Sequence, residues 1–457
     1  MKQWPLVHRR VLVLGLVFFA NASLYGVAWA GDFERAYLAA LQNDARYQAA
    51  KYALTSAQQA SPLALSSLLP SVSASLSETA VQGTRNTDVA GGGTVSSDLD
   101  YRAPSQSINL RAPLINLEAS ARYRQANAQV GSAEAAFAGR KAELVDRLAL
   151  AYLQRMLAED AFLSIHAQVH AVVEQRNLMR RRFEQGEGTR TEVAEARANL
   201  SLVLSQWADS RDQMNNARNA LNSLTGQPQD VITRLPAGFS PPPLVPNALQ
   251  TWQDMALNNN PDVVARKFAV DAAVAGVSRS NAGHMPRLDL VASASSSRNE
   301  SVSSLNQSVN QGSLGVQLNI PIYSGGAVKA AVTQAVAEQS RAEAELEAEQ
   351  RAAELEVGRL FLAVSSGGAR LLAYQDVLES SQIALEGTRR GQASGLRTNV
   401  DVLEAVRKVF QAQRDLAQAR YDHIFQRLRL YNKAGIAPEA VVSYIDELLG
   451  SAESSAP

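Results

Sequence analysis

Residues able to carry out acid–base, nucleophilic or metal chemistry are scarce in this sequence. Its 457 residues include five histidines and no cysteine. His166 and His170 are four positions apart, which would place both imidazoles on one face of a helix, where they could share a metal ion. No third ligand stands near them in sequence, so we assign no metal site. No Ser–His–Asp or paired-carboxylate arrangement stands out, and we predict neither enzyme activity nor a cofactor.

Composition argues against nucleotide and nucleic-acid binding. The run Gly91-Gly92-Gly93 lies between two predicted strands, whereas a phosphate-binding loop precedes a helix. Acidic and basic residues are equal in number, and the first 30 residues contain three basic residues and no acid. Without that segment the chain is slightly acidic, whereas a nucleic-acid binder would show a basic surplus.

Residues 1–30 have the features of a secretory signal. Lys2, Arg9 and Arg10 form the charged start, an apolar stretch follows, and Ala28-Trp29-Ala30 fits the cleavage pattern, so the mature chain should begin near Gly31. A retained membrane helix is the alternative, but the apolar run is short for a span. An exported chain without cysteine has no disulfides and no lipid-anchored cysteine, so its stability must come from packing and assembly.

The chain repeats itself with a period of about 200 residues. Ala40-Leu41-Gln42-Asn43-Asp44 recurs as Ala256-Leu257-Asn258-Asn259-Asn260, and Gly186, Glu192 and Gly226 recur 209 positions later as Gly395, Asp401 and Gly435. A period of this size indicates a duplicated domain-sized unit. We predict repeat 1 over 31–234, a proline-rich linker over 235–247, repeat 2 over 248–437 and a short, frayed tail over 438–457.

Each repeat begins with a helix and two strands. Apolar residues three and four apart predict helices over about 32–59 and 248–280, and alternation of apolar and polar residues then predicts strands over about 71–82 and 105–115 in repeat 1 and about 287–297 and 313–323 in repeat 2. The polar stretches 83–104 and 296–312 between them are predicted to be loops.

A long helical hairpin completes each repeat. Long proline-free stretches of helical period follow the strands and are broken by glycine-rich turns at about 184–190 and 391–397. The arm before the first turn, of about 70 residues, would be roughly 105 Å long. We interpret the arms as antiparallel coiled-coil hairpins that pack side by side.

Four amphipathic strands cannot form a closed barrel. Each predicted strand has one apolar face and one face rich in Ser, Asn or Gln, as membrane barrel strands do. Unpaired strand edges cannot face lipid, and bacterial barrels need about eight strands at least. The pattern therefore predicts that several copies combine their strands. Soluble hairpins attached to a helical protein are the alternative.

Both hairpin turns resemble those of TolC-type outer-membrane channels. The second motif is Gly395-Leu396-Arg397-Thr398-Asn399-Val400-Asp401-Val402-Leu403-Glu404, and the first is Phe183-Glu184-Gln185-Gly186 followed by Thr191-Glu192-Val193. Pro321-Ile322-Tyr323-Ser324-Gly325-Gly326 resembles the family's strand-to-helix junction, and Leu68-Leu69-Pro70 and Gly283-His284-Met285-Pro286 resemble its type I secretion branch. The resemblance covers about residues 31–437. It implies an α+β membrane protein in which three chains form a 12-stranded β-barrel, continued by an α-helical barrel across the periplasm.

The resemblance also implies roles for residues at the turns. Arg397 and Glu192 would link adjacent hairpins and hold the entrance closed, and Gln392 stands where many members have Tyr. Asp401 and Glu404, one helical turn apart, would form stacked acidic rings that favour cations. Gly186, Gly188 and Gly395 would form the tips at which an adaptor docks. The alternative for all these charges is an ordinary solvated helix surface.

These expectations describe a passive exit channel in the outer membrane of a Gram-negative bacterium. The resemblance implies a homotrimer in outer-membrane lipid, with a periplasmic adaptor and an inner-membrane ABC transporter that supplies an unfolded secreted protein. One alternative is a channel for small-molecule or drug efflux with a proton-driven pump. An alternative of another class is a periplasmic adaptor or coiled-coil scaffold, although adaptors usually have one hairpin within β-rich modules.

Overall fold

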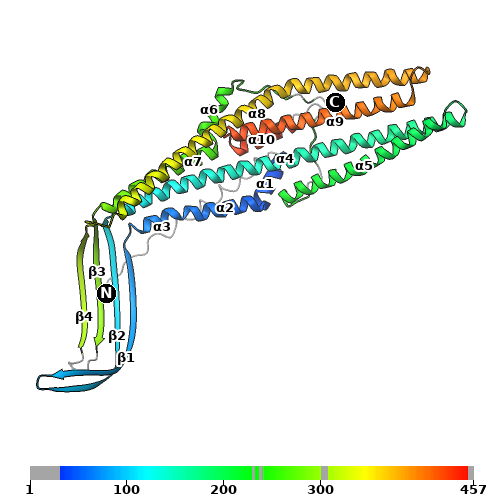
Figure 1. Ribbon diagram of the computed structural model, residues 1–457. Helices are drawn as coiled ribbons and strands as arrows, with labels where there is room; N and C mark the ends of the chain where they lie inside the picture. The colour runs from blue at the N-terminus through cyan, green and yellow to red at the C-terminus, as the bar shows by residue number, and fades with distance from the viewer. Residues whose placement is uncertain (1–30, 229–231, 236–238, 240, 300–306, 451–457) are drawn as a thin grey trace, which may run out of the picture.

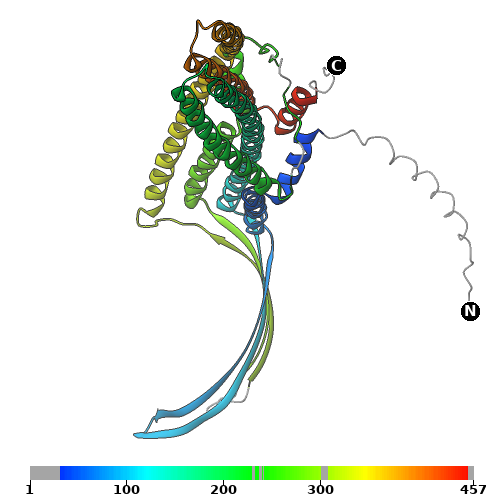
Figure 2. The same ribbon diagram turned by 90° about the vertical axis from the view of Figure 1, so that its right-hand side faces the viewer.

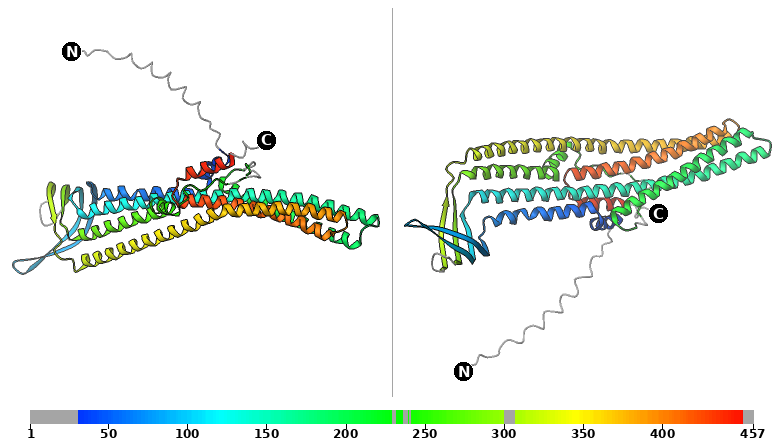
Figure 3. Two further views of the ribbon diagram at one scale, coloured as in Figure 1. Left: turned by 90° about the horizontal axis from the view of Figure 1, so that it is seen from above. Right: turned by 60° about the horizontal axis from the view of Figure 1, so that its bottom comes forward.

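A four-stranded sheet and a long helical body form the two ends of the molecule (Figure 1). The computed structural model describes residues 31–228, 232–235, 239, 241–299 and 307–450, so the predicted signal segment lies outside the described residues. Both helical hairpins point away from the sheet, and their turns lie together at the far end of the body (Figures 1 and 3). None of the helices in the described ranges is long and apolar enough to cross a membrane.

The sheet is antiparallel and follows the order of the chain. Its strands are β1 (Ser71–Val89), β2 (Gly93–Ile115), β3 (Arg287–Asn299) and β4 (Gln307–Asn319). The central pairing joins β2 to β3, so it joins the two repeats. Figure 2 shows that the sheet is strongly curved and that β1 and β2 extend beyond the other pair. Among the described residues, β1 and β4 each pair on one side only.

The register separates apolar from polar residues across all four strands. Val72 lies opposite Leu110, which lies opposite Ala292, which lies opposite Leu314. The adjacent row contains Ser73, Asn109, Ser293 and Ser313. Because neighbouring positions of a strand point to opposite faces, the sheet has one apolar and one polar face. Val72 and Leu314 are both exposed, so no described residue of the chain covers the apolar face at these positions.

The strands extend well into the predicted loops. The prediction of a loop over 83–104 is wrong, because β1 and β2 continue through it and turn only at residues 90–92. Polar composition suggested a loop, but paired Thr, Ser and Asp residues still form a ladder when backbone groups match. Pro104, which has no N–H to donate, lies one residue before the described pairing of β2 with β3, which begins at Ser105.

In repeat 2 the strand limits also differ from the prediction. β3 and β4 include residues 296–299 and 307–312 of the predicted loop, and residues 300–306 lie outside the described part. The predicted strand over 313–323 ends four residues early, at Asn319. Pro321 has no N–H to donate to a ladder, which is consistent with the end of the strand near this residue.

The predicted first helix of each repeat is broken at equivalent positions. Repeat 1 contains α1 (Asp32–Asn43), α2 (Ala45–Gln58) and α3 (Ala60–Ser66), and repeat 2 contains α6 (Leu249–Asn259), α7 (Pro261–Asn281) and a short 3-10 turn, η1 (Ala282–His284). Asp44 and Asn260 separate the first two helices of each set. The Asp44 side chain accepts from the N–H of Tyr47, and that of Asn260 accepts from the N–H of Asp262. Both residues act as N-caps, so a new helix begins at each.

Two antiparallel hairpins form the helical body. They are α4 (Leu117–Glu184) with α5 (Arg190–Thr225), and α8 (Ala327–Ala393) with α9 (Asn399–Lys433). The returning arm of each hairpin meets the junction between the first two helices of its repeat. The Asn43 amide donates to the carbonyl oxygen of Ser223 at 3.2 Å, and the Asn260 amide donates to that of Lys433 at 2.9 Å. These bonds satisfy carbonyl groups that a helix end leaves unpaired.

The predicted frayed tail is wrong for residues 438–450, which form α10 (Pro438–Gly450). Val441 and Ile445 of α10 are buried with Phe33 and Tyr37 of α1 in the main apolar cluster. The Asp446 carboxylate accepts from the backbone N–H groups of Phe33 and Glu34, at 3.0 and 2.9 Å, and so caps α1. The apolar residues of α10 explain the error, because we inferred fraying from position and composition. Residues 451–457 lie outside the described part.

The proline-rich linker is held against α9. The Arg427 guanidinium, 4 % exposed, donates to the carbonyl oxygens of Pro242 and Pro243. It also lies 5.7 Å from the centre of the Tyr431 ring and 5.2 Å from that of Tyr444. One buried cation therefore joins the linker, α9 and α10.

Candidate functional site

The two hairpin tips have the same local structure. In each, a glycine with positive φ follows the first helix: Gly186 at 79° and Gly395 at 78°. A glycine adopts this conformation without the steric cost that a side chain would bring. A threonine then caps the second helix, Thr189 before α5 and Thr398 before α9. Gly188 does not have a positive φ; a Cβ there would lie 3.2 Å from the backbone nitrogen of Phe183.

Glu192 and Asp401 take part in capping boxes. The Glu192 carboxylate accepts from the backbone N–H of Thr189 at 2.8 Å, and the Asp401 carboxylate accepts from that of Thr398 at the same distance. Each threonine hydroxyl accepts from the backbone N–H of the acid three positions later, at 3.2 Å. The sequence signal was present as Thr-x-x-Glu and Thr-x-x-Asp, and our sequence analysis missed it.

Arg397, Asp401 and Glu404 line one groove between α8 and α9. The groove has a volume of about 510 Å³, and Asp376 and Lys408 also line it. Hydrogen bonds from Thr398, helped by the charge of Arg397, hold the pKa of Asp401 below its ordinary value. Asp401 is therefore an anion at neutral pH. Glu404 lies 3.6 Å from the Arg407 guanidinium and 3.7 Å from the Lys408 ammonium, so cations on α9 partly compensate its charge.

The structure does not join Arg397 to Glu192 within the described chain. The Arg397 side chain lies against the other side of its own turn, where a Cβ on Gly391 would come 2.8 Å from the Arg397 Cγ. Glu192 belongs to the other hairpin and is engaged by Thr189. Gln392 is buried, at 9 % exposure, and its carbonyl oxygen accepts from the N–H of Gly395. A contact between Arg397 and Glu192 would therefore need a second copy of the chain.

One contact near the tips connects the two hairpins directly. Gln175 of α4 donates from its side-chain amide to the Asn399 side-chain oxygen at 2.7 Å. Asn399 is 2 % exposed and is the first residue of α9. Sequence reasoning had no signal for this contact, because a Gln and an Asn 224 positions apart carry no spacing pattern. The contact fixes the start of α9 relative to α4.

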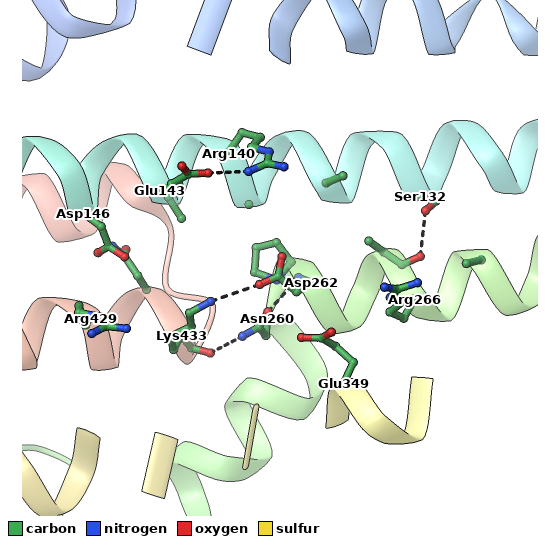
Figure 4. Close-up of a pocket in the computed structure, with 17 residues that line it drawn as sticks. Ser132, Arg140, Glu143, Asp146, Asn260, Asp262, Arg266, Glu349, Arg429 and Lys433 are labelled. Carbon is green, nitrogen blue, oxygen red and sulfur yellow. Dashed lines mark hydrogen bonds and ion pairs between the residues drawn. The ribbon is translucent and has the colours of Figure 1, made fainter. Parts of the chain in front are cut away.

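A polar cavity of about 610 Å³ lies farther from the tips, where α4, α7, α8 and α9 meet (Figure 4). Its charges are largely engaged with one another: Lys433 pairs with Asp262 at 3.2 Å, and Arg140 pairs with Glu143 at 2.7 Å. Burial raises the pKa of Asp146, although a hydrogen bond from the Asn432 amide opposes this effect. We interpret the cavity as part of the joint between α9 and α7.

Comparison with known proteins identifies the class of molecule that has this fold. The sequence model of the Outer membrane efflux protein family matches residues 36–227 and 252–435, one segment in each repeat. The chain therefore belongs to this family of outer-membrane channels. It lies in the outer membrane, with the helical portion in the periplasm.

Relatives with known names cover nearly the whole chain. The alkaline protease secretion protein AprF of Pseudomonas aeruginosa is 32 % identical over 92 % of this chain and 88 % of its own length. The proteases secretion protein PrtF of Dickeya chrysanthemi is 30 % identical over 95 % and 94 %. The outer membrane protein TolC of Vibrio cholerae is 27 % identical over 92 % and 94 %.

Solved structures show the same fold at lower identity. The outer-membrane channel OprN is 19 % identical, with a TM-score of 0.75 over 88 % of this chain and 90 % of its own. The outer membrane protein VceC of Vibrio cholerae is 20 % identical, with a TM-score of 0.73 over 88 % and 96 %. The architecture is therefore that of known outer-membrane channels.

Proposed function

We propose that three copies of the chain form the exit channel of a type I secretion system. The observation that carries this proposal is an amphipathic sheet whose outer strands, β1 and β4, each have an edge unpaired within the described chain. Such edges cannot face lipid, and four strands are too few for a bacterial barrel. Three copies would pair β4 of one chain with β1 of the next and give twelve strands. The apolar row would then face lipid and the polar row the lumen.

A secreted polypeptide is the cargo we favour. The two relatives named for protease secretion match this chain at 30–32 % identity over more than nine tenths of its length. A relative named as a solvent efflux pump component matches at 25 % over 55 %. An inner-membrane ABC transporter would supply the energy, and the channel itself would catalyse no reaction. Small-molecule efflux with a proton-driven pump remains the second candidate, supported by the family's efflux members.

The tips would form the closed entrance and the docking surface for a periplasmic adaptor. Arg397 and Asp401 lie in one groove near the turn, and both hairpins end at this level. Around a threefold axis, Asp401 and Glu404 would become rings of negative charge that favour cations. Arg397 would contact Glu192 of an adjacent hairpin in a neighbouring copy and hold the entrance shut. Gly186, Gly188 and Gly395 would shape the turns that the adaptor meets.

Deletion of the gene, with complementation, separates the two candidate cargoes. Secretion predicts that one or a few proteins disappear from the medium and return with the wild-type gene, while drug susceptibility is unchanged. Efflux predicts the reverse. If both the secreted proteome and drug susceptibility were unchanged, both functions would be contradicted. The other class we considered, an adaptor or scaffold, does not fit membership of a channel family.

A gel experiment tests the assembly independently of cargo. Outer-membrane extracts should contain a species three times the mass of the chain that dissociates on boiling. A mature product that stays monomeric in water without detergent would overturn the proposed barrel.

A further inference from the structure

His166 and His170 lie on the exposed surface of α4, away from the tips. The described residues contain four histidines: this pair, the exposed His284 and the buried His423. The centres of the His166 and His170 rings are 4.7 Å apart and the ring planes cross at 75°. No hydrogen bond or ion pair joins either imidazole to another described residue, so their nitrogen lone pairs are available.

The separation of the two rings matches that of two imidazoles on one metal ion. A bond of about 2.0–2.1 Å from metal to nitrogen places the ion about 3.2 Å from each ring centre. The two ring centres would then be about 4.5 Å apart at a right angle and about 5.2 Å apart at a tetrahedral angle. The observed 4.7 Å lies between these values. The spacing of the ring centres therefore allows one ion to bind both imidazoles once rotation of the side chains directs a nitrogen of each ring at it.

The helix holds the pair in place before any ion arrives. Ile165 and Val172, on the opposite side of this stretch of α4, are buried. This packing fixes the backbone that carries both histidines. On one side, the Phe162 ring stacks on His166 with centres 6.3 Å apart, and Trp207 of α5 lies 6.1 Å from Phe162. A chelating pair on a rigid helix loses little entropy on binding, which favours affinity.

We propose that His166 and His170 form a binding site for a divalent late transition-metal ion, with Cu²⁺ bound more tightly than Ni²⁺ or Zn²⁺. Imidazole suits these ions, and affinity for nitrogen ligands peaks at Cu²⁺. In the described part of the chain no three His, Cys, Asp or Glu residues are grouped to hold a metal. The other coordination positions therefore belong to water or to a small ligand from solution. This argues for an exchangeable surface site rather than a closed structural one.

Calorimetric titration of the purified, detergent-solubilised protein with Cu²⁺ tests the proposal, with a purification tag that contains no histidine. We expect one ion per chain. Each single variant, His166→Ala and His170→Ala, should weaken binding by more than the roughly tenfold effect typical of losing an outer-shell partner. His284→Ala, which removes an exposed histidine elsewhere, should bind as the wild type does. All three variants are at exposed positions, and the boiling-sensitive oligomer on gels shows whether each has folded.

Trp207 provides a second, local readout. Among the described residues the only other tryptophan is Trp252, which is buried against Tyr431. Cu²⁺ at the histidine pair should quench Trp207 emission, and Trp207→Phe should remove this quenching while the heat of binding persists. Equal binding by wild type and His166→Ala, or loss of binding in His284→Ala, would overturn the proposal. An absence of Cu²⁺ binding by the wild type would do so as well.

Discussion

Asn43 occupies the space in which a side chain of residue 226 would lie: a Cβ on Gly226 would come 2.5 Å from the amide carbon of Asn43. Repeat 2 has the same relationship, with a Cβ on Gly435 placed 2.4 Å from the Asn259 carbonyl. Both glycines have positive φ, 69° and 79°, just beyond the ends of α5 and α9. These contacts bring each returning arm to the junction between the first two helices of its repeat. The two repeats therefore share this close contact between glycine and asparagine as well as the arrangement of their helices.

Gly226→Ala and Gly435→Ala should each destabilise the protein. A non-glycine residue at positive φ costs about 1–3 kcal/mol, and the contact with asparagine adds to this cost. Thermal unfolding followed by circular dichroism in detergent should show a lower midpoint for both variants. Gly387→Ala is the matched control, because Gly387 lies within α8 with open space around it. Alanine favours a helix by about 1 kcal/mol over glycine, so this variant should gain stability. If all three variants lowered the unfolding midpoint equally, the close contacts of Gly226 and Gly435 would not explain the loss of stability.

Asp44 combines an N-cap with an ion pair to α4. Its carboxylate accepts from Arg147 in two hydrogen bonds, at 2.7 and 2.9 Å, and from the N–H of Tyr47 at 2.7 Å. Asp44→Ala removes both roles and leaves the half-buried Arg147 with only the more distant Glu143, 3.9 Å away, as a partner. We expect a loss toward the lower end of about 3–5 kcal/mol, because Arg147 is partly exposed. Asp44→Asn should lose less, since Asn260 caps α7 at the equivalent position. If Asp44→Asn were as unstable as Asp44→Ala, capping would make no contribution separate from that of the ion pair.

The same ion pair predicts a loss of stability in acid. The hydrogen bonds from Arg147 lower the pKa of Asp44 from its ordinary 3.8. The unfolded chain therefore takes up a proton at higher pH than the folded chain does. The stabilisation is complete above about pH 4 and is lost as pH falls through the lowered pKa. Unfolding midpoints measured between pH 5 and pH 2 should show this loss in the wild type, and the part due to Asp44 should be absent in Asp44→Asn.

His423 predicts a different acid response. Burial, helped by the nearby Arg427, lowers the pKa of His423 from 6.5 to about 4. Between these values the unfolded chain binds the proton and the folded chain does not, so stability should fall as pH falls from 6.5 to 4. The contribution is of order 1–3 kcal/mol. His423→Gln should flatten the pH dependence in this window, and His284→Gln, at an exposed position, should not. An unchanged slope in His423→Gln would contradict the assignment.

Gly367 explains why His423 can be buried. A Cβ on Gly367 would lie 2.3 Å from the His423 Nδ1, so α8 and α9 approach closely only because residue 367 has no side chain. Gly367→Ala should push the imidazole aside and lower the unfolding midpoint. Since alanine favours a helix, a decrease would point to the contact itself. An increase, as expected for Gly387→Ala, would show that His423 adapts without cost.

The sequence predicted the architecture because both periodicities were strong. The strands β1 to β4 could be predicted from the alternation of apolar and polar residues, and the hairpin turns from their glycines, because both signals are local in sequence. Three of the predictions about strands, helices and the tail were wrong because they depended on contacts that the sequence of a single strand or helix does not reveal. Pairing partners extended β1 and β2 through polar residues, capping by Asp44 and Asn260 divided the first helices, and the apolar face of α10 found a core formed by residues from α1.

The candidate site was less accessible to sequence reasoning. The predicted residues lie at the tips, but Glu192 and Asp401 make their described hydrogen bonds with the capping threonines of their own turns. The link between Gln175 and Asn399 joins residues far apart in sequence and leaves no pattern. Contacts between copies, on which a latch depends, cannot be inferred from one chain's spacing.

The proposed latch makes Arg397 a determinant of conductance. Arg397→Ser should raise single-channel conductance in planar bilayers, because it removes a contact that closes the entrance. Arg351→Ser, in the part of α8 far from the tips, is a suitable control, since Arg351 pairs with Glu347 of its own helix. Its conductance should stay closer to that of the wild type. Unchanged conductance in Arg397→Ser would count against the latch.

Asp401 has two possible roles, and the structure allows them to be separated. As a cap, its carboxylate engages Thr398; as part of a ring, its charge selects ions. Thr398→Ala removes the hydroxyl half of the capping box and keeps the charge, so it should cost about 0.5–2 kcal/mol of stability without changing selectivity. Asp401→Lys combined with Glu404→Lys reverses the charge at both positions, and the reversal potential in a salt gradient should then shift toward anions.

A charge change far from the tips provides the control for that measurement. Asp209 is an exposed residue in the middle of α5, and Asp209→Lys changes the net charge of the chain by the same amount per site. A selectivity shift in this variant as large as in the double variant would attribute the effect to overall charge. A shift in the double variant alone would assign selectivity to the tip. If Thr398→Ala shifted the reversal potential, the hydrogen bond from Thr398 would be needed to position the Asp401 carboxylate for ion selection. The two roles of Asp401 would then be coupled.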